Sequence, residues 1–220
     1  MPAPKPYHHG DLREALMRAA EALIGEVGPR AFTLREVARR AGVSHNAPYR
    51  HFASRDDLLR AVAAEGFERL RTTMIRHMHP GTSARDRLVL CGCGYVQFAL
   101  RWPQHFLVMF DLAEMVSGGE DTMRLGESAF RVLLDAVTTA QQERILPAGD
   151  PMPLAWTAWS LVHGIAKLAI GGNLPLSQRA TLDFTRMAAE SFVNGMAGPA
   201  DAIVGPAGQP PAWPKSRPQG

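Results

Sequence analysis

The sequence predicts an all-α protein of about nine helices, and three observations carry this prediction. Apolar residues recur at three- and four-residue steps along most of the chain, which is the period of an amphipathic helix. Glycine or proline separates the periodic segments, as expected at helix ends. No segment alternates apolar and polar residues as a half-buried strand does. With 46% hydrophobic and 20% charged residues over 220 positions, the composition is typical of a folded globular protein.

The first two helices have clear starts and stops. The first is predicted over residues 11–27 and ends at Gly28. The second begins at Thr33, whose hydroxyl can cap the helix while Glu36 reaches back to complete a capping box. Gly42 supplies the left-handed residue that ends this second helix and turns the chain sharply. The apolar face of the first helix is formed by Leu12, Leu16, Ala19, Leu23 and Val27.

A short third helix and a long fourth helix follow the turn. The third is predicted over residues 45–52, with Ser44 as its N-cap. Pro48 is expected within its first turn, where the missing N–H costs little. The fourth begins after Ser54, with Asp57 in the capping-box position, and its apolar stripe fades near residue 79.

The rest of the chain continues the helical pattern up to a biased tail. Further helices are expected over residues 84–102, 104–113, 121–145, 154–170 and 177–196. Residues 198–220 are rich in proline, glycine and alanine and are expected to be disordered, because they cannot bury enough apolar surface. Residues 1–10 are expected to form a flexible arm.

The segment from Thr33 to Leu58 has the spacing of a helix-turn-helix. Such a motif needs a glycine in its tight turn, here Gly42, and an apolar residue just after it to lock the angle, here Val43. It also needs polar residues at the start of its second helix, where side chains reach base edges in the major groove. The charge agrees in direction, because residues 1–79 carry a net +4 and residues 80–220 a net −1. The N-terminal part is therefore predicted to bind double-stranded DNA.

These residues resemble the TetR family of bacterial transcriptional regulators. The resemblance lies in the string Leu34-Arg35-Glu36-Val37-Ala38-Arg39-Arg40-Ala41-Gly42-Val43-Ser44 followed by Tyr49-Arg50-His51-Phe52. It implies a three-helix DNA-binding domain over residues 11–56 and a helical effector-binding and dimerisation domain over residues 57–197. The family's DNA contacts, carried over position by position, are Thr33, Arg35, Ser44, His45, Asn46, Pro48, Tyr49, His51 and Arg55.

Pro48 departs from the family pattern, which usually has a bulky aliphatic residue at this position. Proline beyond the first turn removes a helical hydrogen bond, so the third helix could start a residue or two late. Phe52 is interpreted as a core aromatic residue, whereas Tyr49 is expected to present its hydroxyl to DNA. Arg55 stands where the family usually has lysine, and either residue can bind phosphate.

The C-terminal half is predicted to hold both a dimer interface and an effector pocket. Trp156, Trp159, His163 and Lys167 lie on one helical face and resemble a Trp-then-His-Gly signature of one TetR subgroup. The resemblance implies a homodimer joined through residues 154–170 and 177–196. A mostly apolar site for an unknown small-molecule effector would be lined by Tyr95, Phe98, Trp102, Phe106, Met109, Phe110, Trp156, Trp159 and His163.

The function that follows is a ligand-responsive repressor that binds a palindromic operator as a dimer and is released by a small apolar effector. The main alternatives are an enzyme and a protein-interaction module that has lost DNA binding. No catalytic motif, cofactor motif or metal-ligand spacing stands out, and His77 with His79 is too little for a zinc site. Cys91 and Cys93 are interpreted as buried structural residues. Without a signal peptide or an apolar run of membrane length, a cytoplasmic location is expected.

Overall fold

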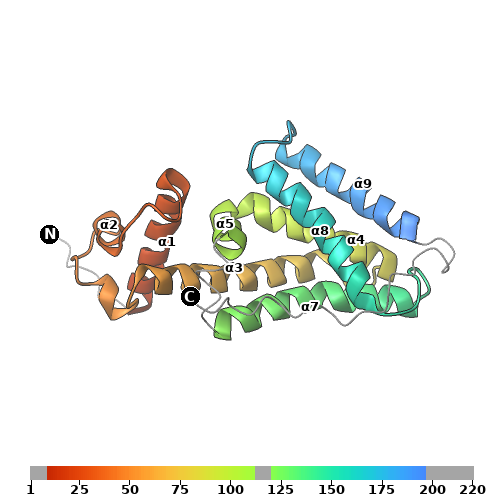
Figure 1. Cartoon of the computed structure of the whole chain (residues 1–220), viewed down its shortest axis with the longest axis horizontal. Coiled ribbons are helices and arrows are strands. Elements are labelled where there is room, and N and C mark those ends of the chain that lie inside the picture. The colour runs from red at the N-terminus through yellow and green to blue at the C-terminus, as the bar shows by residue number, and fades with distance from the viewer. Residues whose placement is uncertain (1–8, 112–119, 197–220) are drawn as a thin grey trace, which may run out of the picture. The chain divides into compact units, whose positions relative to one another are not determined.

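The computed structural model describes residues 9–111 and 120–196, and every regular element within these ranges is a helix (Figure 1). The predicted all-α class is confirmed for this part of the chain. The predicted tail and the arm up to residue 8 lie outside it. The elements in chain order are α1 (His9–Val27), α2 (Leu34–Arg40), the 3₁₀ helix η1 (Pro48–Arg50), α3 (Arg55–His77), α4 (Ala84–Arg101), α5 (Pro103–Asp111), α7 (Glu120–Gln142), α8 (Pro151–Ile170) and α9 (Gln178–Met196).

The predicted caps of α2 and α3 are present. Thr33 has extended backbone angles, and its hydroxyl accepts a hydrogen bond from the Glu36 amide at 3.3 Å while the Glu36 carboxylate accepts from the Thr33 amide at 2.7 Å. Ser54 accepts from the Asp57 amide at 3.1 Å. These bonds satisfy backbone donors that have no partner within the helix. The sequence pattern therefore located both helix starts.

Two predicted helix starts are wrong. Residues 45–47 are not helical, and the only helix between α2 and α3 in the described chain is the single turn Pro48–Arg50, with Ala47 rather than Ser44 at its N-cap. Proline stands at its first position because that position needs no N–H donor. For the same reason α8 begins at Pro151, three residues before the predicted start, with the Asp150 side chain accepting from the Met152 amide at 3.0 Å.

The chain divides into two compact units, each built from two separate stretches of sequence. Among the described residues, the first unit comprises 9–73, 97–111 and 120–130, and the second comprises 74–96 and 131–196. Helices α3, α4 and α7 each contribute residues to both units. The N-terminal helices thus share a unit with α5, which lies far along the sequence.

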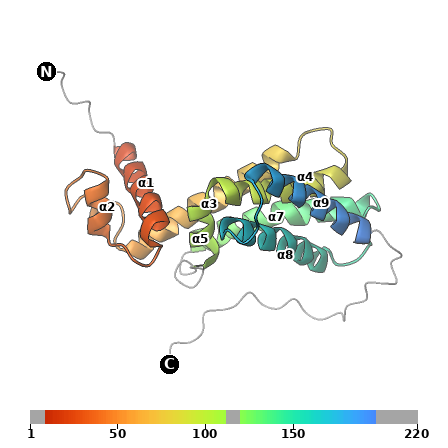
Figure 2. The same cartoon turned by 90° about the horizontal axis from the view of Figure 1, so that it is seen from above.

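The core of the first unit forms where α1 packs against α2 and α5 (Figures 1 and 2). Glu26 of α1 forms an ion pair with Arg40 of α2, which ties the two helices together at the surface. Burial of large apolar side chains supplies most of the favourable free energy of such a core. Its fully buried members include Leu16, Val37, Leu58, Val62, Phe98 and Phe106.

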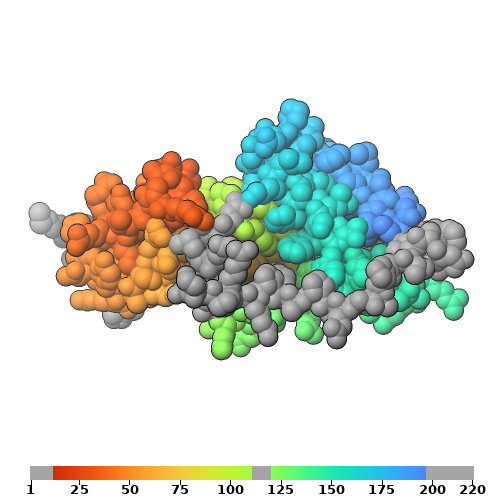
Figure 3. All heavy atoms as spheres, viewed as in Figure 1, coloured from red at the N-terminus to blue at the C-terminus, as the bar shows by residue number. Residues whose placement is uncertain are grey.

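In the second unit, α8 packs against α9. The atoms of these two helices form one continuous surface in the space-filling view (Figure 3). Gly92 of α4 lies against this pair: a Cβ there would be 3.1 Å from Val162 Cγ1. Cys91 and Cys93 on the same helix are buried, as predicted. Burial raises the pKa of the Cys91 thiol to about 12, which keeps it protonated at neutral pH.

In the described ranges, no helix is both long enough and apolar enough to span a bilayer.

Candidate functional site

The turn between α2 and η1 has the geometry of a helix-turn-helix. Gly42 adopts φ 69°, a left-handed conformation that residues with a Cβ rarely adopt. Its amide donates to the Arg39 carbonyl at 3.2 Å, and the Val43 amide donates to the Ala38 carbonyl at 3.0 Å. These two bonds close the end of α2 and redirect the chain. Val43, which was predicted to fix the angle of the turn as an apolar residue, is only half-buried.

The segment that follows the turn exposes the polar side chains expected there. Ser44, His45 and Asn46 are all exposed. Tyr49 is 52% exposed, which is unusual for an aromatic residue in a folded domain. The Ala47 amide donates to the Ser44 carbonyl at 2.9 Å, so the three polar residues stand on a hydrogen-bonded turn. This turn holds several hydrogen-bonding side chains at the surface beside an aromatic hydroxyl.

Pro48 and Phe52, in contrast, are buried rather than exposed to solvent. Pro48 is buried, so among the predicted DNA contacts it offers little surface, and its ring anchors the turn. Phe52 is 3% exposed and lies in the core, as expected. The Arg13 guanidinium of α1 stacks over the Phe52 ring at 5.5 Å, an attractive cation–π contact. The two buried rings hold the exposed turn against the rest of its unit.

Some of the flanking residues that were predicted to contact DNA interact with other groups of the protein itself. The Thr33 hydroxyl is 2.9 Å from the Glu36 carboxylate within the capping box, whereas Arg35 is exposed. Arg55 Nη1 donates to the Arg30 carbonyl at 2.9 Å, which fixes the loop before α2 to the start of α3. His51 is half-buried, and its Nε2 is buried without a hydrogen-bond partner in the described chain. Arg35 and the exposed turn are therefore the accessible part of the predicted set.

Three of the predicted pocket residues meet within the second unit. The Tyr95 hydroxyl of α4 lies 2.8 Å from His163 Nδ1 of α8, and Trp159 Nε1 donates to the same hydroxyl at 3.2 Å. Tyr95 is buried, and burial holds the pKa of its hydroxyl above the usual value. The rings of Trp159 and His163 are 5.7 Å apart in an edge-to-face arrangement. Trp156 is half-buried on the same helix.

The other predicted pocket residues belong to the first unit. Phe98 and Phe106 are fully buried, which makes them core residues there. The Phe98 and Trp102 rings are 5.7 Å apart, and those of Phe106 and Phe110 are 4.9 Å apart. Met109 is also buried. The predicted pocket set therefore falls into two groups in different units.

A cluster that the sequence analysis did not find lies in the first unit. Glu21, Glu65 and His105 come from three helices, and their ligand atoms lie within 4.8 Å of one another. One sequence signal points to it: His105 stands four residues before Met109 and shares the apolar face of its helix. The two glutamates carry no such signal, because they resemble ordinary surface residues until the tertiary structure assembles them.

Comparisons with known proteins agree with this geometry. Residues 16–62 match the family described as bacterial regulatory proteins, tetR family, and residues 88–191 match the tetracyclin repressor-like C-terminal domain. The HTH-type transcriptional regulator BetI of Rhizobium meliloti (strain 1021) is 28% identical over 185 residues, which cover 83% of this chain and 87% of that protein.

Solved structures give the same result over most of the chain. A protein of unknown function from Rhodococcus sp. RHA1 is 34% identical, with a TM-score of 0.76 over 88% of this chain and 100% of that one. A putative TetR-family transcriptional regulator from Rhodococcus sp. is 26% identical, with a TM-score of 0.68 over 83% of this chain and 99% of that one. With both of its halves matched and its fold shared, this chain belongs to the TetR family of DNA-binding transcriptional regulators.

Proposed function

We propose that the protein is a ligand-responsive repressor that binds a palindromic operator as a homodimer and is released by a small apolar effector. The observation that carries this proposal is the exposed polar turn from Ser44 to Asn46, set on a buried proline and followed by the exposed Tyr49. A surface turn of this kind has no structural need for three hydrogen-bonding side chains and an aromatic hydroxyl. Recognition of a DNA groove gives each of them a partner.

The four exposed side chains have different expected roles on DNA. Asn46 can form two hydrogen bonds with adenine, and His45 and Ser44 can each contact base edges or nearby phosphates. Tyr49 would donate its hydroxyl to the phosphate backbone, with Arg35 at the start of α2 binding an opposite phosphate. Base contacts set sequence preference, whereas phosphate contacts set overall affinity and its salt dependence.

A homodimer through α8 and α9 is supported by apolar side chains that the single chain leaves in water. Leu168 of α8 is 46% exposed and Met187 of α9 is 56% exposed. Gly164 lies in the middle of α8, where glycine costs about 0.5–1 kcal/mol relative to alanine, yet a Cβ there would meet nothing within 4 Å. A partner helix that approaches closely at Gly164 would explain both features. A dimer also pairs two recognition turns, which is the symmetry that a palindrome reads.

The proposed effector site is centred on Tyr95, Trp159 and His163. Two aromatic rings and an imidazole provide an apolar wall with a small number of placed polar groups, which is the usual make-up of a small-molecule site. An effector that binds one arrangement of α4 and α8 better than another would shift the populations of the two arrangements. Release of the operator follows if the favoured arrangement separates the two recognition turns by the wrong distance.

The DNA part of the proposal is tested by titrating the protein against the promoter region upstream of its own gene, measured by fluorescence anisotropy at several salt concentrations. Asn46→Ala should weaken specific binding by about 1–3 kcal/mol, as expected for loss of a base contact, and should leave the salt dependence unchanged. Arg35→Gln should weaken specific and non-specific binding alike and reduce the salt slope by about one.

Arg124→Gln serves as the matched control, because Arg124 is an exposed arginine of α7 outside the proposed interface and forms an ion pair with Asp121, which is also exposed. It should bind like the wild-type protein. A wild-type protein that gives no salt-sensitive binding to any promoter fragment would instead support a protein-interaction module. Operator binding that stays constant across a panel of small aromatic and aliphatic compounds, at concentrations that quench tryptophan fluorescence, would contradict release by an apolar effector.

A further inference from the structure

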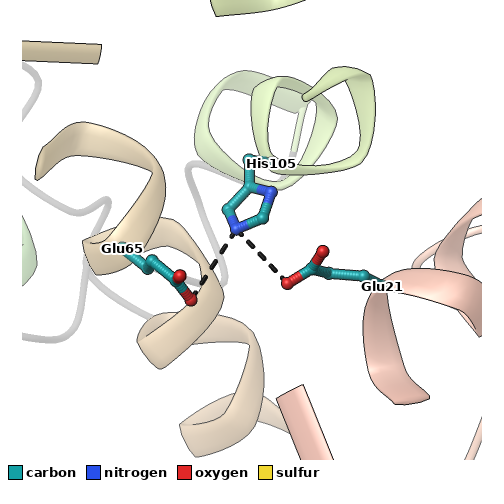
Figure 4. A group of neighbouring side chains, drawn as sticks. All are labelled: Glu21, Glu65 and His105. Atoms are coloured by element: carbon teal, nitrogen blue, oxygen red, sulfur yellow. Dashed lines mark ion pairs between the residues drawn. The ribbon is translucent and has the colours of Figure 1, made fainter. Parts of the chain in front are cut away.

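His105 of α5 lies between two glutamates that come from different helices of the first unit (Figure 4). Its Nε2 is 3.6 Å from Oε1 of Glu21 on α1 and 3.9 Å from Oε2 of Glu65 on α3. The His105 side chain is 0% exposed, whereas the glutamate side chains are 26% and 34% exposed. The imidazole therefore faces a partly hydrated pair of carboxylates from the protein interior.

Neither ring nitrogen of His105 has a hydrogen-bond partner in the described chain. Burying a polar atom without a hydrogen-bond partner is unfavourable, and both ring nitrogens are in this position. The 3.6 and 3.9 Å separations are too long for direct hydrogen bonds. In its neutral form an imidazole has a lone pair available for a ligand.

One carboxylate oxygen of each glutamate faces His105, and the Arg69 guanidinium pairs with the other oxygen of Glu65. Glu65 Oε1 accepts a hydrogen bond from Arg69 Nε at 2.9 Å, which leaves Oε2 on the side of His105. Two acidic oxygens and one imidazole nitrogen thus converge on a small volume, and a positive charge placed there would interact favourably with all three.

We propose that Glu21, Glu65 and His105 form a binding site for a divalent transition-metal ion of the Zn²⁺ class. Zinc bonds of about 2.1 Å at tetrahedral angles place donor atoms about 3.4 Å apart. The distances of 3.6 and 3.9 Å from Nε2 to the two oxygens are close to this value, and all three donor atoms lie within 4.8 Å of one another. Side-chain rotations that bring the two carboxylates closer together would complete the site. The site goes beyond the proposed apolar effector, because it lies in the other unit and takes a different class of ligand.

The donor set also selects among metals. An imidazole nitrogen with carboxylate oxygens suits Zn²⁺ and its first-row neighbours, whereas Mg²⁺ and Ca²⁺ prefer oxygen ligands alone. Three protein ligands leave one tetrahedral position for water, which can enter past the partly exposed glutamates. Arg69 orients Glu65 from outside the site, as hydrogen-bonded partners of metal ligands commonly do. The bound ion would link α1, α3 and α5.

The test uses the full-length chain, stripped with a chelator and titrated with ZnCl₂ by isothermal calorimetry. Two closely spaced histidine pairs in the sequence, His8 with His9 and His77 with His79, could bind zinc themselves, so all four are first replaced by glutamine in a background variant. This variant should bind one zinc ion per chain. Zinc-edge X-ray absorption of the complex should show nitrogen and oxygen ligands without sulfur. The same variant titrated with MgCl₂ should show no comparable binding.

Single substitutions in that background then identify the ligands. Glu21→Gln and Glu65→Gln keep the side-chain shape and should each weaken zinc binding by at least about tenfold, the lower limit for changing even an outer-shell partner. His105→Gln should abolish it. Glu68→Gln is the matched control, because Glu68 lies on the same helix as Glu65 and also forms an ion pair with an arginine, Arg71. It should leave zinc binding unchanged.

Circular dichroism and thermal unfolding without zinc confirm that each variant is folded. Because Glu21 is partly exposed, Glu21→Gln keeps the test decisive even if His105→Gln unfolds the protein. A background variant that binds no zinc, or binds it equally well after Glu21→Gln and Glu65→Gln, overturns the metal site. Neither calorimetry nor X-ray absorption uses DNA, so a failure of the metal site is distinct from a failure of the proposed repressor function.

Discussion

The Tyr95 hydroxyl and Nδ1 of His163 form a hydrogen bond, with 2.8 Å between the two atoms. The indole N–H of Trp159 donates to the same hydroxyl at 3.2 Å. Because a tyrosine hydroxyl can both donate and accept, it can bind both neighbours at once. A buried tyrosine thus joins the two α8 side chains of the proposed effector site.

Tyr95→Phe should lower the free energy of unfolding by about 1–3 kcal/mol. The substitution removes both hydrogen bonds and leaves the Trp159 N–H and His163 Nδ1 without this partner in a partly buried place. Urea unfolding followed by circular dichroism measures the change. Tyr49→Phe is the matched control: Tyr49 is exposed, so the same loss of a hydroxyl should leave stability within about 0.5 kcal/mol of wild type. Equal effects of the two substitutions would contradict the Tyr95 network.

Gly66→Ala should destabilise the first unit although alanine favours a helix. The gain in helix propensity is about 0.5–1 kcal/mol, but overpacking of a close-packed core typically costs about 1–3 kcal/mol. A Cβ at Gly66 would overlap Met109 Sδ and lie 3.0 Å from Met109 Cγ and 3.2 Å from His105 Cβ. A lower thermal midpoint is therefore expected.

Gly195→Ala is the control for this prediction. Gly195 is also helical, but a Cβ there would meet nothing within 4 Å, so the substitution should be neutral or slightly stabilising. If Gly66→Ala proves as well tolerated as Gly195→Ala, the close approach of α3 and α5 at Met109 is wrong.

Cys91 and Cys93 should resist alkylation in the native protein. Both thiols are buried, and burial raises both pKa values, that of Cys91 to about 12. The thiolate is the reactive form; that of Cys91 is therefore nearly absent at pH 8, and Cys93 forms less of it than an ordinary cysteine does. Mass spectrometry after brief iodoacetamide treatment should find both residues unmodified in native protein and both modified in guanidinium chloride. Rapid native modification of Cys91 would show that its helix face is open to solvent.

The raised pKa of Cys91 also predicts the direction in which the stability of the protein changes at alkaline pH. Since the folded-state pKa of Cys91 lies above its ordinary value of 9.0, the unfolded chain releases this proton first. Its contribution to stability is therefore complete below pH 9 and is lost as pH rises toward 12. Cys91→Ala should flatten the fall in urea midpoint between pH 8 and pH 10 relative to wild type, and an unchanged slope would argue against the raised pKa.

Met187→Glu should convert the proposed dimer into monomers. Met187 is 56% exposed, so a charge is tolerated by the single chain, but it would be costly inside an apolar interface. Light scattering after size-exclusion chromatography measures the mass. Met123→Glu is the matched control, because Met123 of α7 is 44% exposed and lies outside the proposed interface. A dimer that survives Met187→Glu and Leu168→Glu would exclude α8 and α9 as the joining surface.

The sequence determined the helical class and the local features that depend on near neighbours. The capping box at Thr33, the N-cap at Ser54 and the turn at Gly42 were predictable, because each rests on residues within four positions. The late start of η1 was foreseen only as an alternative. The correct start depends on Pro48, whose missing N–H is tolerated at the first position of a helix.

Only the tertiary structure decided which distant residues meet. The sequence predicted that Tyr95 and Phe98, on one helix, line the same pocket. In the fold, however, Tyr95 forms hydrogen bonds with Trp159 and His163, whereas Phe98 is buried in the other unit. It also brought Glu21 and Glu65 to His105. Local patterns record preferences over a few residues, whereas contacts between helices depend on packing that no single segment contains.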